Sequence, residues 1–309
     1  MERESFERNN PREEFGRKVE VHAKFIRHSE KKFPRSENEV PLSENGIKKS
    51  EELGEGLEKR DRIEGEYSDT VRARNTTESV VFHSPTENKL KTKERGELAF
   101  RCSDDFMLRT RKHIEEVSKK SQKEIAKKGT EAGASTEGID YYLSFGDKRP
   151  DNETYSPEET AATVAKRLDI AIRKADRLHS GTKMDAIFTS HDYVVAAFLK
   201  EVMSKQDEDG KKVEGFTSLE DIGGMIQPLE GFELIAKTDE TGQKTIEFNF
   251  RGQNYEFNTE RFEELVKIAS RLEEEDLKKK ESKKAEIESG GGLNKILEQE
   301  LNNKLGRKE

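Results

Sequence analysis

Two polar segments, each containing a histidine, follow runs of apolar residues in this 309-residue chain. The first, residues 27–30 with the sequence Arg-His-Ser-Glu, follows the alternating apolar run 19–26. The second, residues 189–192 with the sequence Thr-Ser-His-Asp, follows a shorter apolar run. Ligands of open α/β sheets bind beyond the carboxyl ends of the strands. If the two apolar runs are neighbouring strands, His28 and His191 lie together at one such edge.

Two arginines stand at the start of a predicted helix in the segment 67–80, at Arg72 and Arg74. Cations at a helix N-terminus oppose the helix dipole, so this placement suggests that an anion binds there. A helix that begins near Asp192 would add partial positive charge beside the second histidine. Two histidines with arginines beside them therefore predict a pocket for a phosphate or another oxyanion.

The segments around these motifs alternate between strand and helix patterns. Residues 194–202 carry an apolar helical stripe directly after the strand 186–188, which makes a strand–turn–helix unit. Ser43 and the segment 156–159 (Ser-Pro-Glu-Glu) resemble helix N-termini, and the second contains a capping box. Three short strand patterns, at 232–236, 246–250 and 255–257, are separated by the glycines Gly242 and Gly252. The sequence therefore predicts a three-layer α/β fold, a mostly parallel sheet flanked by helices, with a late antiparallel meander.

One folded domain with charged extensions fits the composition. Charged residues make up 39% of the chain and hydrophobic residues 30%, which is enough for one modest core. We predict a flexible charged arm at 1–17, an α/β domain at 18–272 with a last helix from Thr259, and a charged tail at 273–309 that is partly helical or disordered. The Lys-rich stretch 107–155 is predicted to be a helical or mobile insertion in the domain.

The composition also excludes several classes of protein. No window approaches the roughly 18 consecutive apolar residues of a membrane helix, and residues 1–18 lack the apolar region of a secretory signal. Cys102 is the only cysteine, which excludes a disulfide framework and a multi-cysteine metal site. The net charge of -8 argues against a nucleic-acid partner. We therefore expect a cytoplasmic protein without a metal, a membrane contact or a nucleic-acid partner.

The order of four segments resembles the histidine phosphatase superfamily, and more narrowly its phosphoglycerate mutase-like branch. These segments are 27–30 (Arg-His-Ser-Glu), 41–46 (Pro-Leu-Ser-Glu-Asn-Gly), 68–78 (Ser-Asp-Thr-Val-Arg-Ala-Arg-Asn-Thr-Thr-Glu) and 188–192 (Phe-Thr-Ser-His-Asp). The resemblance extends over residues 19–203. Four motifs in the family's order are a more specific signal than any one of them.

The resemblance implies a role for each matching residue. His28 matches the nucleophile, which carries a phosphohistidine intermediate. Arg27 and Arg72 match arginines that neutralise the oxygens of the transferring phosphoryl group, and His191 matches the second histidine of the pocket. Phosphoryl transfer needs mainly positive charge around an in-line attack, and a neutral histidine nitrogen is available near pH 7. The resemblance implies no metal and no organic cofactor.

The general acid is left open among three carboxyl groups. The leaving alkoxide must receive a proton, so a carboxyl group is needed near the pocket. In the mutase-like branch the acid is a glutamate after the second motif, which favours Glu97, with Glu94 next. Asp192 is a rival, because the acid phosphatase branch uses an aspartate directly after the second histidine, and we also expect Asp192 to contact the substrate. Ser29 and Asp192 each replace a glycine of the mutase-like pattern.

We therefore expect a metal-independent phosphomonoester hydrolase that acts through a phosphohistidine. Its substrate is a phosphorylated small molecule or a phosphoprotein. One alternative is a phosphomutase of the same superfamily, which needs the same pocket and must keep the phosphorylated intermediate from water. The other alternative is a phospho-ligand-binding or scaffold protein with little turnover.

Overall fold

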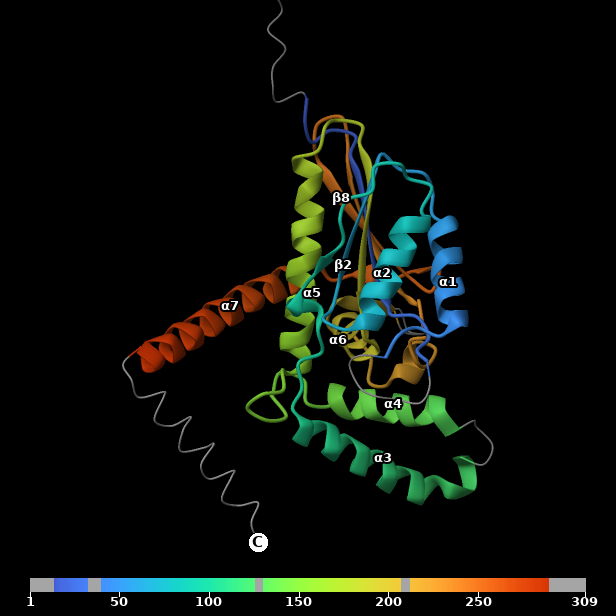
Figure 1. The fold of residues 1–309 in the computed structure, drawn as a ribbon, viewed down its shortest axis with the longest axis vertical. Coiled ribbons are helices and arrows are strands. Elements are labelled where there is room, and N and C mark those ends of the chain that lie inside the picture. The colour runs from blue at the N-terminus through green and yellow to red at the C-terminus, as the bar shows by residue number, and fades with distance from the viewer. Residues whose placement is uncertain (1–13, 33–39, 126–129, 207–211, 289–309) are drawn as a thin grey trace, which may run out of the picture.

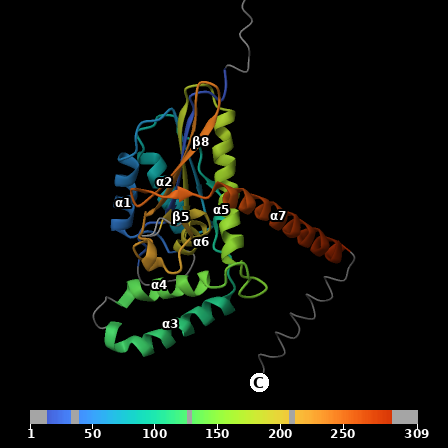
Figure 2. The same cartoon turned by 180° about the vertical axis from the view of Figure 1, so that it is seen from behind.

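Helices cover both faces of a central sheet, which gives the fold three layers (Figure 1). The same layers are seen from behind in Figure 2. The structure is a computed structural model that describes residues 14–32, 40–125, 130–206 and 212–288. The predicted three-layer α/β class is confirmed.

The central sheet combines a parallel and an antiparallel part. Its strands are β1 (Glu20–Arg27), β2 (Arg62–Tyr67), β3 (Lys93–Glu94), β4 (Lys183–Ser190), β7 (Gly231–Thr238), β8 (Lys244–Phe250) and β9 (Gln253–Asn254). The order in the sheet is β3-β2-β4-β1-β7-β8-β9. The first four strands of that order pair in parallel, and β7, β8 and β9 continue the sheet antiparallel. The predicted parallel sheet with a late meander is therefore confirmed.

The last part of the meander differs from the prediction. Residues 255–257 were expected to be its third strand, but β9 takes that place in the sheet, and β10 (Glu256–Phe257) pairs with β5 (Met203–Gln206). The strand β6 (Lys212–Glu214) completes this small second sheet. The reason is the tight turn after β8, which leaves only two residue pairs between β8 and β9 before the chain leaves the central sheet.

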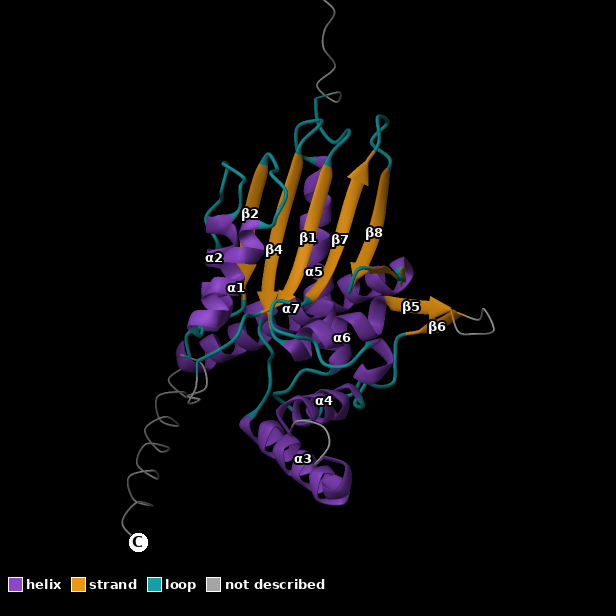
Figure 3. Ribbon diagram, turned by 90° about the vertical axis from the view of Figure 1, so that its right-hand side faces the viewer, coloured by secondary structure: helices purple, strands orange, loops and turns teal. Residues whose placement is uncertain are grey.

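The helices are divided between the two faces. The helices α1 (Glu44–Glu55) and α2 (Val71–His83) cover one face, and α5 (Pro157–Ile172), α6 (Asp192–Val202) and the start of α7 (Thr259–Glu288) cover the other. The helices α3 (Asp104–Ile125) and α4 (Thr130–Leu143) form a hairpin beyond the carboxyl ends of the parallel strands (Figure 3). The described part of the predicted insertion at 107–155 is thus largely helical.

Two helix starts follow the sequence signals. The side chain of Ser43 accepts a hydrogen bond from the backbone N–H of Gly46 at the start of α1. At α5, Ser156 and Glu159 form a capping box with Pro157 in the first turn. Each serine cap satisfies an otherwise unpaired backbone donor and contributes about 1 kcal/mol to stability. Both predicted helix starts are confirmed.

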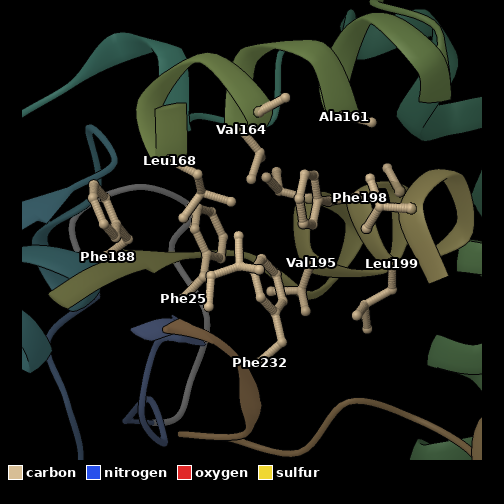
Figure 4. Close-up of a cluster of buried hydrophobic side chains, with 14 of the residues drawn as sticks. Phe25, Ala161, Val164, Leu168, Phe188, Val195, Phe198, Leu199 and Phe232 are labelled. Atoms are coloured by element: carbon tan, nitrogen blue, oxygen red, sulfur yellow. The ribbon is translucent and has the colours of Figure 1, made fainter. Parts of the chain in front are cut away.

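The larger hydrophobic core lies between the sheet and the helices α5, α6 and α7. Phe25 of β1 stacks on Phe232 of β7 with ring centroids 5.3 Å apart, and Phe198 of α6 stacks on Phe232 at 4.8 Å (Figure 4). A smaller cluster lies under α1 and α2 and includes Ile26 and Ile187. Val21, Ala23 and Phe25 of β1 enter the larger cluster and Ile26 enters the smaller one, so the end of the strand is packed from both faces.

The extensions of the chain are only partly described. Residues 14–17 of the predicted arm bond to the segment before β4, with Gly16 N–H donating to the Leu178 carbonyl oxygen, and residues 1–13 lie outside the described residues. The predicted tail from 273 continues α7 as far as 288, and the remainder lies outside the described residues. Within the described part of the chain, no helix is long and apolar enough to cross a membrane.

Candidate active site

The two strand-end histidines are neighbours. β1 and β4 pair in parallel with Arg27 opposite Ser190, so His28 and His191 follow paired residues. The backbone N–H of His28 donates to the Ser190 carbonyl oxygen at 2.9 Å. The two imidazole rings meet edge to face with centroids 5.3 Å apart. The structure thus brings together the two motifs that stand more than 160 positions apart in the sequence.

The ring of His28 is held in one tautomer. Its Nδ1 lies 2.8 Å from the Ser29 carbonyl oxygen, which can only accept, so Nδ1 carries the proton. Its Nε2 lies 2.9 Å from the Nε of Arg72, which can only donate, so Nε2 presents its lone pair. Burial, and then the charges of Arg72 and Arg27, lower the pKa of His28 to about 3. The imidazole is therefore neutral at pH 7, with an unprotonated Nε2.

His191 is held in the opposite tautomer, with its proton on Nε2. It is the N-cap residue of α6, and its Nδ1 lies 3.4 Å from an Nη of Arg72. Because the guanidinium can only donate, Nδ1 is the acceptor, and Nε2–H donates to the Ser68 hydroxyl oxygen at 3.3 Å. Burial first, and then the charges of His28 and Arg72, lower the pKa of His191. Both rings therefore enter the site uncharged.

Arg72 joins the two histidines from the first turn of α2. The helix is capped by Thr70, and its first turn contains no acidic residue, so the helix itself supplies no counter-charge to Arg72. Burial is the main cause that lowers the pKa of Arg72, while the guanidinium remains a cation at all ordinary pH values. The Arg72 side chain therefore lies between the two imidazole rings at the start of α2.

Arg27 and Asp192 form an ion pair at the same edge. An Nη of Arg27 lies 3.1 Å from a carboxylate oxygen of Asp192, and both side chains are less than one-fifth exposed. The other Nη of Arg27 donates to the carbonyl oxygen of Ile226 at 2.5 Å. Asp192 thus places a carboxyl group beside Arg27 at this edge of the sheet.

Ser29, directly after His28, is hydrogen-bonded to both α1 and α2. The Ser29 hydroxyl donates to the Gly46 carbonyl oxygen at 2.8 Å, and Ser29 N–H donates to the Thr76 hydroxyl at 3.0 Å. A Cβ at Gly46 would lie 2.3 Å from the Glu30 carbonyl oxygen, so only glycine lets α1 approach this closely. Ser29, noted in the sequence only as a departure from the mutase-like pattern, therefore ties the residues after β1 to α1 and α2.

The two glutamates considered as general acids have other surroundings. Glu97, in the short helix η2 (Gly96–Leu98), lines a small pocket with Arg101, Tyr155 and Asp276. Glu94 is exposed on β3, opposite Tyr67. Asp192 is the one of the three carboxylates that forms an ion pair with a pocket residue among the described residues.

Two residues of the site were not found by sequence reasoning. Ser68 stands at the end of β2 and contacts His191, and its position four residues before Arg72 was the available signal. The Ile226 carbonyl, which contacts Arg27, gives no signal because any residue type can supply a backbone oxygen. In the described part of the chain, no cluster of three or more His, Cys, Asp or Glu side chains could hold a metal ion.

No known family's sequence model matches the chain, and no curated protein matches it in sequence. Among solved structures it is similar to a mycobacterial glucosyl-3-phosphoglycerate phosphatase at 13% identity and a TM-score of 0.42, covering 74% of this chain and 97% of that one. A mycobacterial hydrolase gives 11% identity and a TM-score of 0.44 over 81% and 98% of the two chains. A protein histidine phosphatase complexed with tungstate gives 13% and 0.32 over 75% and 94%.

The chain is similar in structure to members of the histidine phosphatase superfamily. At these identities and TM-scores the likeness concerns the fold. We therefore base the proposal of function on the geometry of the site.

Proposed function

We propose that the protein is a metal-independent phosphomonoester hydrolase that forms a phosphohistidine on His28. The observation that carries the proposal is the unprotonated Nε2 of His28, held 2.9 Å from a cationic Arg72 with Arg27 at the same strand end. A buried neutral imidazole next to two guanidinium groups is suited to attack a phosphoryl group while its oxygens are neutralised.

In the first step Nε2 of His28 attacks phosphorus, and the ester P–O bond breaks as the P–N bond forms. Arg72 must release Nε2 and donate its N–H groups to the phosphoryl oxygens instead. The Nδ1 proton stays on the imidazole and keeps its hydrogen bond to the Ser29 carbonyl oxygen, which stabilises the positive charge that the ring gains. The neutral His191 lies beside the phosphoryl group and contributes no repulsion to the cations.

The leaving alkoxide takes a proton from Asp192 in this proposal. Asp192 is preferred to Glu97 because its carboxylate contacts Arg27, whereas Glu97 lines a separate pocket. The proton enters the site with the bound monoester or from solvent before the P–O bond breaks, and Asp192 passes it to the leaving oxygen. In the second step the Asp192 carboxylate accepts a proton from water, the water oxygen bonds to phosphorus, and the P–N bond breaks to release phosphate.

The test is a burst experiment with p-nitrophenyl phosphate in the presence of EDTA. The wild-type protein is expected to release one equivalent of p-nitrophenol rapidly and to retain phosphate that survives alkali and is lost in acid. His28→Ala is expected to show neither signal. His179→Ala is the matched control, because the His179 side chain is 69% exposed, and it should behave as the wild type does. Undiminished activity of His28→Ala in EDTA would overturn the proposal.

The binding-protein alternative is favoured by one specific observation. Arg72 occupies the lone pair that must attack, and Arg27 is paired with Asp192, so both guanidinium groups already have protein partners that compete with a substrate. A protein that only binds phosphorylated ligands would show phosphate-dependent thermal stabilisation in the wild type and no burst. The same experiment therefore separates the two functions.

A further inference from the structure

The side chain of Arg251 donates hydrogen bonds to several residues of the segment 222–230. Its Nε and an Nη donate to the two carboxylate oxygens of Glu230 at 2.7 and 2.9 Å. The same Nη donates to the carbonyl oxygens of Met225 and Gly224 at 2.9 and 3.1 Å, and the other Nη donates to that of Ile222. The guanidinium is thus the common partner of three backbone carbonyls and one carboxylate, and the side chain is only 18% exposed.

The backbone at Arg251 is of the kind that normally favours glycine. Its φ is +53°, in the left-handed region, and the following Gly252 has φ +67°. For a residue with a side chain this conformation costs about 1–2 kcal/mol. Gly223 faces the guanidinium, and a Cβ there would lie 2.7 Å from an Nη of Arg251. An arginine is thus placed where glycine would be less strained, which indicates that its side-chain contacts offset the strain.

The segment that Arg251 holds is in turn bonded to Arg27. The Ile226 carbonyl oxygen accepts from an Nη of Arg27 at 2.5 Å. The backbones are also joined, because Leu229 N–H donates to the Arg27 carbonyl oxygen and Arg27 N–H donates to that of Glu230. One side of the segment is therefore held by Arg251, and the other side holds the arginine next to the candidate nucleophile.

We propose that Arg251 is a positioning residue for phosphate binding, acting through the segment 222–230 on the guanidinium of Arg27. By fixing the Ile226 carbonyl it sets the direction of one Nη of Arg27, which leaves the rest of the guanidinium directed at Asp192 and the incoming phosphate. The inference rests on the proposed function only in assigning phosphate to this site. Arg251 itself touches neither substrate nor the reacting atoms.

A purely structural role of Arg251 is the competing explanation, and the chain offers a matched control. Arg261 is also partly buried, at 25% side-chain exposure, and binds Glu158, Glu201 and Glu264. Those partners belong to α5, α6 and α7, so Arg261 supports the helical layer and not the segment 222–230. Arg251→Lys and Arg261→Lys each remove a bidentate or branched set of bonds while keeping the charge.

The experiment measures binding of inorganic phosphate by calorimetry and the KM and kcat for p-nitrophenyl phosphate, each at a fixed interval below the variant's own Tm. Arg251→Lys is expected to raise both the phosphate Kd and KM roughly tenfold, since a displaced guanidinium loses charge-assisted bonds to phosphate. Arg261→Lys is expected to lower Tm without changing Kd. In an Arg27→Ala background the effect of Arg251→Lys on the phosphate Kd should disappear, because the guanidinium that Arg251 positions is no longer present.

Three outcomes contradict the inference, and they differ from one another. Equal phosphate affinity in Arg251→Lys and Arg261→Lys overturns it while leaving the proposed function intact. An undiminished effect of Arg251→Lys in the Arg27→Ala background overturns the route through Arg27. A wild-type protein that neither binds phosphate nor forms a phosphoenzyme overturns the proposed function together with the inference.

Discussion

The two arginines of the site each contact other residues of the same cluster. Arg27 contacts Asp192 and the Ile226 carbonyl, and Arg72 contacts both histidines. Each of these two arginines therefore already has protein partners. In the proposed reaction a phosphate replaces or joins them, and the ion pair between Arg27 and Asp192 positions both the proposed acid and a proposed phosphate-binding cation.

Replacing Asp192 by asparagine tests this assignment. Asp192→Asn keeps the shape of the side chain and removes the transferable proton, so hydrolysis of glycerol 2-phosphate should fall by roughly 10²–10⁴-fold. The rate of p-nitrophenol release should fall much less, because p-nitrophenolate departs without a proton. First-turnover rates on the two substrates, followed by rapid quench, measure the difference, because steady-state turnover of both also includes the second step, in which Asp192 is the base. Glu97→Gln is the control and should leave both rates unchanged, and a selective loss on the alkyl substrate in Glu97→Gln would instead assign the acid to Glu97.

At the scale of elements, residues 28–30, which follow β1, are held by hydrogen bonds to two helices on one face of the sheet. Ser29 bonds to α1 through the Gly46 carbonyl and to α2 through Thr76, while His28 bonds to β4 through Ser190. Glu30 receives hydrogen bonds from Asn45 and Lys49 of α1. The position of α1 against this segment is thus part of the site, although α1 contributes no side chain to the cluster around His28.

Substitution of Gly46 by alanine tests this role of α1. The new Cβ would lie 2.3 Å from the Glu30 carbonyl oxygen, so α1 or residues 28–30 must shift. The expected loss is roughly 1–3 kcal/mol in the free energy of unfolding, together with weaker phosphate-dependent stabilisation. Gly96→Ala is the control, because a Cβ at Gly96 has no heavy atom within 4 Å. Urea unfolding with and without phosphate measures both effects, and equal behaviour of the two variants would refute this role of α1.

At the scale of the whole molecule, the site makes folding sensitive to acid. The pKa of His28 is lowered to about 3 by burial and by Arg72, and burial also lowers that of His191. An unfolded histidine titrates near pH 6.5. Below that pH the two histidines bind protons in the unfolded chain but stay neutral in the folded protein, so the free energy of unfolding falls as the pH falls. The same burial that keeps the nucleophile neutral therefore reduces the stability of the fold at low pH.

This linkage predicts a pH-dependent effect of removing His28. Wild-type protein should lose about 2 kcal/mol more stability than His28→Gln when the pH is lowered from 7 to 5, since glutamine does not titrate. Urea unfolding of both proteins in phosphate-free buffer at the two pH values provides the measurement. If the two proteins lose the same stability over that interval, His28 titrates in the folded protein as it does in the unfolded chain, and the lowered pKa that follows from its burial is wrong.

Much of the fold could be predicted because its signals are local. The alternation in 19–26 and the apolar run 186–188 predicted strands with polar ends, and Ser43 and Ser156 predicted helix starts. Hydrophobic alternation and N-terminal caps depend on residues a few positions apart, so they can be recognised without knowing the topology. The end of the meander was predicted wrongly at residues 255–257, because the partner of a two-residue strand is chosen by distant segments.

The sequence by itself determined which residue types stand at the ends of β1 and β4 and at the start of α2, and so the chemistry of His28, Arg72 and His191. Only the tertiary structure decided that Asp192 pairs with Arg27, because that contact depends on β1 and β4 lying side by side in the sheet. The tertiary structure also decided that Arg27 bonds to the Ile226 carbonyl and that Arg251 holds the same segment. Neither contact can be recognised in the sequence, because any residue type can supply a backbone carbonyl and long-range contacts leave no local periodicity.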